Sequence, residues 1–407
     1  MQNPDYFKKK ALEISDNIIA WRRELHKIPE PGIHTPKTQA FICAELDKLG
    51  IQYRKDVGGN GCTGIVALIE GKKTGPKKVF AIRADCDGLP IREETGLPYA
   101  STNENMHACG HDAHSAIALG AAKIIRENIE NLEGSVKILF QPGEEGNPEG
   151  PGGAKRMLDD GALQNPRPDV ITGLHVGKVG PATKPGTFNL RREAMMACMD
   201  RFTIKVCGVG CHGAYPQNSV DPIMISAQII SAVQTIVSRE ISTLTPVVVS
   251  FGSIHAGTVF NIIPPECTMS GTIRALKNEV RETLAKRIGE IAKAVAEGMR
   301  GSVVYDFNRD GPPPLVNNPA VTEEFRKTAE QLFPGEVLEM PEPVMGGEDM
   351  AFFLNDVPGT YVFFNTCDPE KHKFYHHNPR FDIDDSILWK GSAVLSALAF
   401  QWLDEHK

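Results

Sequence analysis

Residues 115–141 read SAIALGAAKIIRENIENLEGSVKILFQ, an apolar segment with helical spacing followed by a short apolar run. Similar short runs stand before and after it: GIVALIE at 64–70, KVFAIRA at 78–84 and DVITGLH at 169–175. Strands that alternate with helices in this way build βα units around a buried, mainly parallel sheet. We therefore predict an α/β fold class for this part of the chain. Before it, residues 5–28 and 35–50 read as two helices.

A second pattern begins near Asp200. Residues 221–240 read as a helix with Asp221 at the N-cap and Pro222 at the first position. With strands over 201–208, 247–256, 266–276 and 302–308 and a helix capped by Asn278, the order is β-α-β-β-α-β, as in ferredoxin-like domains. Helix and strand patterns of the first type return after residue 310. We therefore expect a catalytic domain of residues 1–198 and 310–407, and an inserted α+β domain of residues 199–309.

The composition is that of an ordinary globular protein, with 41% hydrophobic and 23% charged residues, which excludes disordered, fibrous and collagen-like classes. The 44 Lys and Arg against 51 Asp and Glu give a net charge of −7, and no basic run indicates a nucleic-acid partner. No stretch approaches the roughly 18 consecutive apolar residues of a membrane span, and the N-terminal residues lack the apolar region of a signal peptide. We expect a cytoplasmic protein whose nine scattered cysteines are mostly reduced thiols.

Side chains that can bind metals are densest in HACGHDAH, residues 107–114, directly before the apolar helix. Cys109 and His111 are two residues apart, so a regular strand would send them to opposite faces, and only an irregular loop lets both face one ion. A structural zinc site is one explanation of such a loop. However, the chain has no second CxxC or HxxxH half to complete a closed set of four ligands.

Acidic residues or histidines also follow three of the predicted strands. Asp85 and Asp87 follow the strand over 78–84, Glu144 and Glu145 lie in QPGEEG, and His175 ends DVITGLH. Taken alone, the glutamate pair could be a solvated turn and His175 a buried core histidine. In open α/β sheets, however, ligand sites form beyond the carboxyl ends of the strands. The predicted topology therefore brings these loops together with HACGHDAH.

Seven motifs occur in order across nearly the whole chain: RRELHKIPE, RADCDGLP, MHACGHDAHSA, QPGEEG, GLHV, FNIIP and GGEDMAFF. Together they resemble the amidohydrolase subfamily of dinuclear metallopeptidases that contains hippurate hydrolase, N-acetyl-diaminopimelate deacetylase and the indole-acetyl amino acid hydrolases. The wider family includes succinyl-diaminopimelate desuccinylases and acetylornithine deacetylases. There a histidine stands at the position of Asp85, and an aspartate bridges the metals where this subfamily uses a cysteine. This departure favours an amidohydrolase over a desuccinylase.

The resemblance implies two divalent metal ions per subunit, bound by Cys109, His111, Glu145, His175 and His377. The late histidine is assigned by the subfamily pattern of His, small polar residue, Pro, any residue and Phe. This pattern starts at His377, which leaves His376 as a neighbour without a role. We expect zinc, with manganese, cobalt or nickel also compatible with such mixed ligands.

The resemblance also implies roles for residues outside the ligand set. Glu144 would be the general base that takes a proton from metal-activated water and returns it to the departing amine. Asp87 would orient a metal ligand, and the role of Asp85 stays open.

In the inserted domain, a dimerisation or lid domain in this family, His212 would reach the partner subunit's active site and hydrogen-bond the oxyanion. Asn261 and Arg274 would hold the substrate, Arg274 through the amino acid's carboxylate. On composition alone, His212 is only a loop histidine in a Gly-rich turn. We expect a homodimer, or a tetramer.

The expected activity is hydrolysis of N-acyl amino acids, hippurate-like or N-acetylated, to a carboxylate and a free amino acid, as in an aminoacylase. A dipeptidase or carboxypeptidase of the same family is the first alternative, because it uses identical metal chemistry. A thiol hydrolase with Cys109 as nucleophile is the second, although it needs neither the glutamate pair nor His175. A binding module without catalysis would not need Glu144, which is present.

Overall fold

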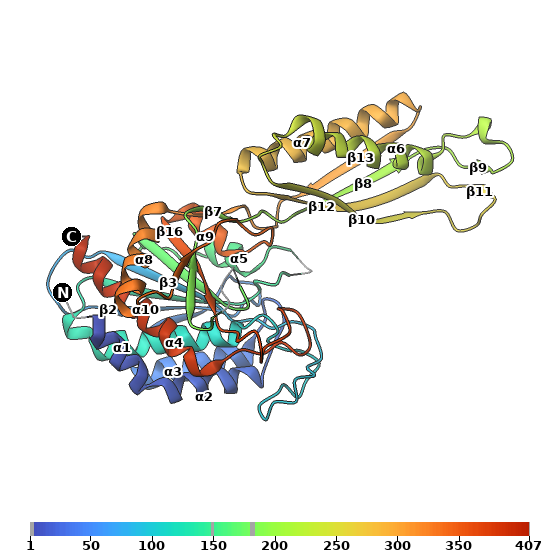
Figure 1. Ribbon diagram of the computed structural model, residues 1–407. Coiled ribbons are helices and arrows are strands. Elements are labelled where there is room, and N and C mark those ends of the chain that lie inside the picture. The colour runs from blue at the N-terminus through green and yellow to red at the C-terminus, as the bar shows by residue number, and fades with distance from the viewer. Residues whose placement is uncertain (1–3, 148–149, 180–183, 407) are drawn as a thin grey trace. The chain divides into compact units, whose positions relative to one another are not determined.

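The computed structural model describes residues 4–147, 150–179 and 184–406 (Figure 1). The chain forms two compact units. The first unit comprises Met1–Glu193, Val316–Glu342 and Asp349–Lys407. The second unit comprises Ala194–Leu315 and Pro343–Glu348. The chain passes between them near two short strands, β7 (Glu193–Met196) and β14 (Leu315–Asn317), and again at Pro343–Glu348.

The first unit is built around an eight-stranded sheet with the order β1-β2-β4-β3-β5-β16-β6-β15. Its centre consists of four parallel strands, β4 (Ser135–Gln141), β3 (Val79–Asp85), β5 (Val170–Gly177) and β16 (Gly359–Asn365). Their residues are almost all buried, which explains why these segments are continuous apolar runs. The predicted α/β class with a mainly parallel sheet is confirmed.

The edges of this sheet are partly antiparallel. β1 (Gln52–Val57) and β2 (Gly64–Glu70) pair antiparallel, because the few residues between them are too short for a parallel crossover. β2 is also antiparallel to β4. At the other edge, β6 (Thr187–Leu190) is antiparallel to β16 and parallel to β15 (Val337–Glu339).

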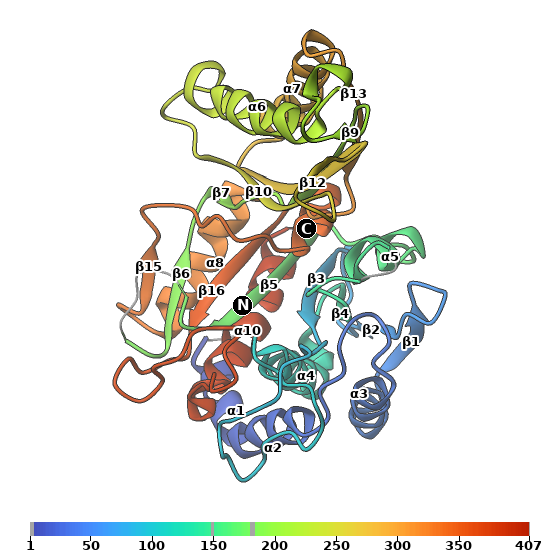
Figure 2. The ribbon, with the colours of Figure 1, turned by 90° about the vertical axis from the view of Figure 1, so that its right-hand side faces the viewer.

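Helices cover both faces of the sheet (Figure 2). One layer holds five helices that pack against one another: α1 (Pro4–Glu13), α2 (Ser15–His26), α3 (Pro36–Leu49), α4 (His111–Glu127) and α10 (Trp389–Glu405). α8 (Pro319–Leu332) packs against α1 and α10, and α5 (Gly153–Asp159) packs against α9 (Met350–Asp356) near β4, β5 and β16. α4 is buried on nearly every side because it lies between the sheet, α2, α3 and α10.

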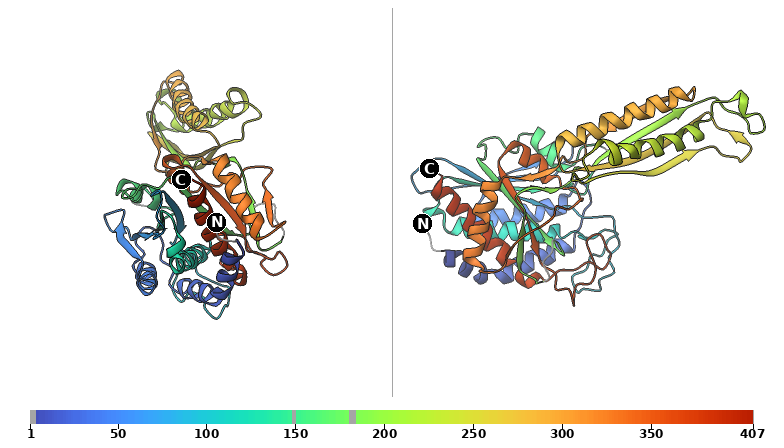
Figure 3. Two further views of the ribbon diagram at one scale, coloured as in Figure 1. Left: turned by 90° about the vertical axis from the view of Figure 1, so that its left-hand side faces the viewer. Right: turned by 45° about the horizontal axis from the view of Figure 1, so that its top comes forward.

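The second unit contains a four-stranded antiparallel sheet with the order β10-β12-β8-β13. In chain order its elements are β8 (Asp200–Cys207), α6 (Pro222–Thr235), β10 (Val247–Ala256), β12 (Glu266–Ala275), α7 (Asn278–Gly298) and β13 (Ser302–Asn308). Figure 3 shows α6 and α7 side by side along the sheet, and their apolar sides form its core with the strands. The predicted β-α-β-β-α-β order and ferredoxin-like fold class are confirmed. Two further strands, β9 (Cys211–His212) and β11 (Ile262–Ile263), pair with each other.

Some local predictions need correction. The single helix expected over residues 5–28 is interrupted at Ile14, which is buried and turns the chain so that α2 packs against α4. The side chain of Asp221 caps α6 and Pro222 is its first residue, as predicted. Asn278 is instead the first residue of α7, after Lys277.

All nine cysteines are free. Among the described residues, no helix has the length and apolarity that crossing a membrane would require.

Candidate metal centre

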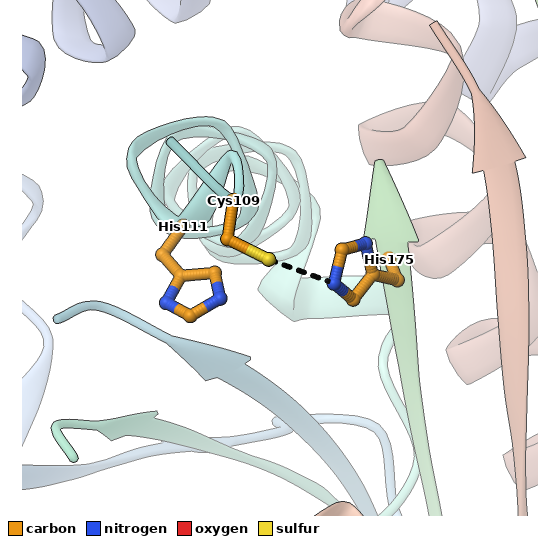
Figure 4. A group of neighbouring side chains, drawn as sticks. All are labelled: Cys109, His111 and His175. Atoms are coloured by element: carbon orange, nitrogen blue, oxygen red, sulfur yellow. Dashed lines mark hydrogen bonds between the residues drawn. The ribbon is translucent and has the colours of Figure 1, made fainter. Parts of the chain in front are cut away.

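Gly110 brings Cys109 and His111 to the same side of the α4 N-terminus. Its φ is +87°, and a Cβ at this position would lie 2.5 Å from the side chain of Val176, so only glycine fits. This left-handed residue turns the chain between Cys109 and His111, the first residue of α4. Figure 4 shows the Cys109 sulfur directed at the His175 ring, and its Sγ lies 3.5 Å from His175 Nε2.

Asp87 holds the turn that carries Glu144 and Glu145. Its carboxylate is buried and accepts the Glu144 N–H at 3.0 Å and the Glu145 N–H at 3.2 Å. The main-chain carbonyl of Asp87 accepts a hydrogen bond from His111 Nδ1 at 3.0 Å. A carbonyl can only accept, so Nδ1 of His111 carries a proton, and in the neutral ring that binds a metal ion the lone pair is on Nε2. Asp87 therefore orients both the glutamate turn and His111.

His377 reaches the same place from a distant part of the chain. Its N–H donates to the Ala108 carbonyl at 2.8 Å, and its Nε2 lies 3.0 Å from Glu145 Oε1. Its φ of +64° is uncommon for a residue with a side chain, and such positions cluster at functional sites. His376 instead directs its Nε2 at the Val176 carbonyl, 3.0 Å away. Of the two histidines, His377 is the one that faces Glu145.

The structure brings the five predicted ligands into one cluster. Two groups share the Cys109 sulfur: one adds His111 and His175, and the other adds Glu145 and His377. Within each group, the three ligand atoms lie within 4.8 Å of one another. A thiolate common to two groups is the arrangement that a bridging ligand between two ions requires.

The donors fit divalent metal ions. His111 Nε2 is buried and has no hydrogen-bond partner among the described residues, and Glu145 Oε1 faces His377, which is itself in the predicted ligand set. A buried polar atom without a partner costs about 1–3 kcal/mol, so His111 Nε2 fits the role of a metal ligand. Sulfur, imidazole nitrogen and carboxylate oxygen together suit zinc and the neighbouring transition metals.

The charges of the cluster also call for a cation. Burial lowers the pKa of His111, but Asp85 and Asp87 outweigh this effect and raise it to about 10. Burial raises the pKa of the Cys109 thiol well above its usual range, and Glu145 and Glu144 raise it further. Without a cation Cys109 is therefore a protonated thiol, not an activated nucleophile, whereas a bound metal ion would deprotonate it.

The other three predicted residues lie in the second unit. His212 is exposed in β9, where its backbone pairs with Ile262, and Asn261 precedes that residue. His212 Nδ1 accepts the Ala214 N–H at 3.1 Å, so its neutral ring carries the proton on Nε2 and can donate it to another group. Arg274 in β12 donates from Nη1 to a side chain and a carbonyl of its own strand.

Sequence reasoning missed a buried polar network behind the cluster. Arg83 in β3 donates to Asp85 Oδ2 at 2.7 Å and to Asp349 Oδ1 at 2.6 Å. It also donates to Gln141 Oε1 at 2.8 Å, and Asp85 is hydrogen-bonded to His114. The available signal was a charged residue inside an otherwise apolar strand, because buried charges need partners.

With this geometry established, comparison with known proteins assigns the family. Residues 81–401 match the profile described as Peptidase family M20/M25/M40. The chain belongs to this family. The resemblance predicted from the seven motifs is confirmed, and the M20 match spans the predicted cluster from Cys109 to His377.

Individual M20 relatives match along nearly their whole length. N-acetyl-L-cysteine deacetylase of Bacillus subtilis (strain 168) is 38% identical over 397 residues, which cover 97% of this chain and 90% of the relative. Thermostable carboxypeptidase 1 of Saccharolobus solfataricus is 37% identical over 397 residues, covering 97% and 98%. The crystal structure of Bacillus subtilis YXEP protein, described as a dinuclear metal binding peptidase from the M20 family, has a TM-score of 0.81 at 30% identity, covering 96% and 99%.

These matches confirm the predicted enzyme class. This M20 family protein is an amidohydrolase, and the family and the dinuclear structural relative support a pair of divalent metal ions.

Proposed function

We propose that this M20 family enzyme hydrolyses the amide bond of N-acyl amino acids and releases a carboxylate and a free amino acid. The observation that carries the proposal is the cluster in which two ligand groups share Cys109, with Glu144 beside them. The similarity to an N-acetyl-L-cysteine deacetylase over 97% of the chain supports an N-acylated substrate.

In this proposal the ions are held by the two groups described above: Cys109 with His111 and His175, and Cys109 with Glu145 and His377. Zinc suits this donor set, and manganese, cobalt and nickel are compatible with it. When bound, such ions supply Lewis acidity that polarises the amide carbonyl and lowers the pKa of water.

Glu144 carries out the proton transfers of the reaction. Its Oε2 lies 4.0 Å from His111 Nε2, and its backbone is held by Asp87. From this position the carboxylate takes a proton from the attacking water and returns it to the nitrogen of the leaving amine. Asp87 contributes by fixing the turn, so the base and the adjacent ligand Glu145 keep their relative orientation.

For the second unit we propose the role that the family resemblance implies. The partner subunit's His212 donates a hydrogen bond from Nε2 to the developing oxyanion, and Asn261 and Arg274 bind the substrate. The Nε2 proton of His212 supports this role, because an oxyanion needs a donor. The proposal requires at least a homodimer, which we expect to be cytoplasmic.

A carboxypeptidase or dipeptidase is the alternative that the comparisons favour most, since a carboxypeptidase is 37% identical to this chain. It would use the same residues on a peptide bond and would differ only in the substrate accepted. The thiol hydrolase is disfavoured because burial and the neighbouring carboxylates keep the Cys109 thiol protonated.

The test combines one substitution with a substrate series. Glu144→Gln should keep two bound ions but lower the turnover number by about a hundredfold or more, the usual cost of losing a general base. Glu133→Gln is a matched control, because Glu133 is a buried acid of the first unit that pairs with Lys73. It should retain wild-type turnover.

The substrate series compares N-acetyl, N-benzoyl and longer-chain acyl amino acids with dipeptides, on enzyme loaded in turn with zinc, manganese, cobalt and nickel. Faster cleavage of dipeptides would replace the N-acyl amino acid proposal with the peptidase alternative. A fall in metal content in Glu144→Gln would instead make Glu144 a ligand.

A further inference from the structure

The main-chain N–H and carbonyl of Val176, the residue directly after His175, are hydrogen-bonded by three imidazole rings. Its N–H donates to His114 Nε2 at 2.8 Å. Its carbonyl accepts from His175 Nδ1 at 2.8 Å and from His376 Nε2 at 3.0 Å. Neither His114 nor His376 belongs to the proposed ligand set, so the function described above leaves both without a role.

These contacts fix the protonation of each ring. A carbonyl can only accept, so the proton of His175 is on Nδ1 and its Nε2 presents a lone pair toward Cys109 Sγ, 3.5 Å away. A backbone N–H can only donate, so His114 Nε2 has the lone pair. The proton of His114 is therefore on Nδ1, where it is shared with Asp85.

Asp85 holds the other ring nitrogen of His114. It is fully buried, one of its oxygens accepts from His114, and the other accepts from Arg83 Nη1 at 2.7 Å. The guanidinium compensates the carboxylate charge of Asp85. His114 lies close enough to Asp85 and His111 to belong to a further metal-binding group, but both of its ring nitrogens are already used.

The residue after Val176 leaves room for the His376 ring. The next residue, Gly177, has a φ of +118°, and a Cβ there would lie 2.0 Å from His376 Nε2. Any larger residue at this position would therefore collide with the His376 ring. The His376 ring also packs edge-on against His175, with ring centroids 5.1 Å apart.

We propose that His114 is a positioning residue that acts on His175 through the Val176 peptide, and that His376 assists it from the carbonyl side. By holding the Val176 N–H, His114 anchors the backbone on one side of Val176, and His376 anchors it on the other, so that the carbonyl stays in place to accept the Nδ1 proton of His175. The Nε2 lone pair is thereby always available to a metal ion. This inference rests on the proposed metal centre, but it does not depend on which amide is the substrate.

Two substitutions of His114 separate its two hydrogen bonds. In His114→Asn the side-chain amide can replace Nδ1 and donate to Asp85, but it cannot reach the Val176 N–H. In His114→Gln the side-chain oxygen can take the place of Nε2 and accept the Val176 N–H, while the bond to Asp85 is lost. If His114 acts through Val176, glutamine should preserve the metal site better than asparagine.

The first readout is metal affinity, measured by competition with a chromogenic chelator using zinc alone. Only one of the two ligand groups contains His175, so His114→Asn should weaken one of the two bound ions by about tenfold to a hundredfold. The affinity for the other ion should change little. His114→Gln should lie closer to the wild type.

The second readout is the protonation of His175 in metal-free protein, observed by NMR with ¹⁵N-labelled histidine. The wild type should show the proton on Nδ1, and His114→Asn should show a mixture of the two tautomers. Ser115→Ala is the matched control. Ser115 is the next residue of α4, is equally buried, and donates to the Asp85 carbonyl at 3.1 Å, but it does not touch Val176.

Wild-type affinity for both ions together with an unchanged His175 signal in His114→Asn would overturn the proposal. A milder effect of asparagine than of glutamine would also overturn it, because the bond to Asp85 would then be the one that matters. If the His114 variants do not fold, His376→Phe tests the same peptide from a surface loop and should weaken the same ion. Both readouts are taken without substrate, so they stand apart from any failure of the proposed N-acyl amino acid activity.

Discussion

Replacing Asp87 with asparagine would test how the glutamate turn of the metal centre is held. The carboxylate of Asp87 uses one oxygen for the Glu144 N–H at 3.0 Å and the other for the Glu145 N–H at 3.2 Å. Asparagine has nearly the same shape, but it offers one oxygen and one NH₂ group. One of the two backbone N–H groups would therefore face a second donor instead of an acceptor.

The expected size of the effect follows from that lost acceptor. A buried N–H without a partner costs about 1–3 kcal/mol, and each 1.4 kcal/mol is about tenfold in a binding constant. The cost applies to the turn conformation that Glu145 needs, so metal affinity should fall by about tenfold to a hundredfold. Burial raises the pKa of Asp87 despite the nearby His111, so the charged form is disfavoured in the metal-free fold. Removal of this charge offsets part of the cost, so the melting temperature of the metal-free variant should fall only slightly.

The assay pairs chelator competition for metal affinity with thermal melting of the metal-free protein. Asp169→Asn is the control, because Asp169 also holds a backbone N–H, that of Val79 at 2.9 Å, but at the opposite end of β3. It should leave metal affinity unchanged. Undiminished affinity for both ions in Asp87→Asn would refute the reasoning that Asp87 orients Glu145.

Three further predictions concern the ligands, the second unit and the core. Cys109→Ser should lower metal content and activity together, since a hydroxyl poorly replaces a thiolate ligand; two tightly bound ions in this variant would remove Cys109 from the set. His212→Ala should lower turnover by about a hundredfold or more at unchanged metal content, and mixing it with inactive Glu144→Ala subunits should restore activity. A mixture that stays inactive although mass spectrometry shows subunit exchange would contradict action from the partner subunit. Asp112→Asn should cost about 1–3 kcal/mol of unfolding free energy at pH 7, because buried Arg22 loses its nearest carboxylate, 2.9 Å away, and keeps only the more distant Asp382 and Asp385. Burial raises the pKa of Asp112, but Arg22 and His26 together outweigh burial and lower this pKa below 3.8. This stabilisation should therefore be present above that pH and lost as the pH falls below it. An Asp112→Asn variant as stable as the wild type in denaturant titrations at pH 7 would contradict the prediction.

The convergence of the site loops could be predicted because it depends only on strand direction. Glu144 follows β4 and His175 lies in β5, and both strands are parallel to β3, which ends at Asp85. Alternating helices and apolar runs determine that direction, and parallel strands then place their carboxyl ends at one edge of the sheet. The metal-binding role of these residues came from the family resemblance and remains a proposal.

The hydrogen-bond partners could not be predicted from the sequence. Asp87 bonds to a backbone group 57 residues away, at Glu144, and no local pattern reports such a contact. No proline or glycine marks the break at Ile14 between α1 and α2. The break depends on how these two helices pack in the folded chain. The start of α7 at Asn278 instead of after it reflects the usual uncertainty of one residue at helix ends.

The two best-buried histidines of the cluster share one feature that links the fold to the chemistry. His111 donates its Nδ1 proton to the carbonyl of Asp87, and His175 donates its own to the carbonyl of Val176. Both acceptors are main-chain atoms, one in β5 and the other two residues after the end of β3, so substitution of a side chain cannot remove them directly. The Nε2 lone pairs are therefore oriented by the sheet itself, and side chains such as Asp87 and His114 act by holding the backbone in place.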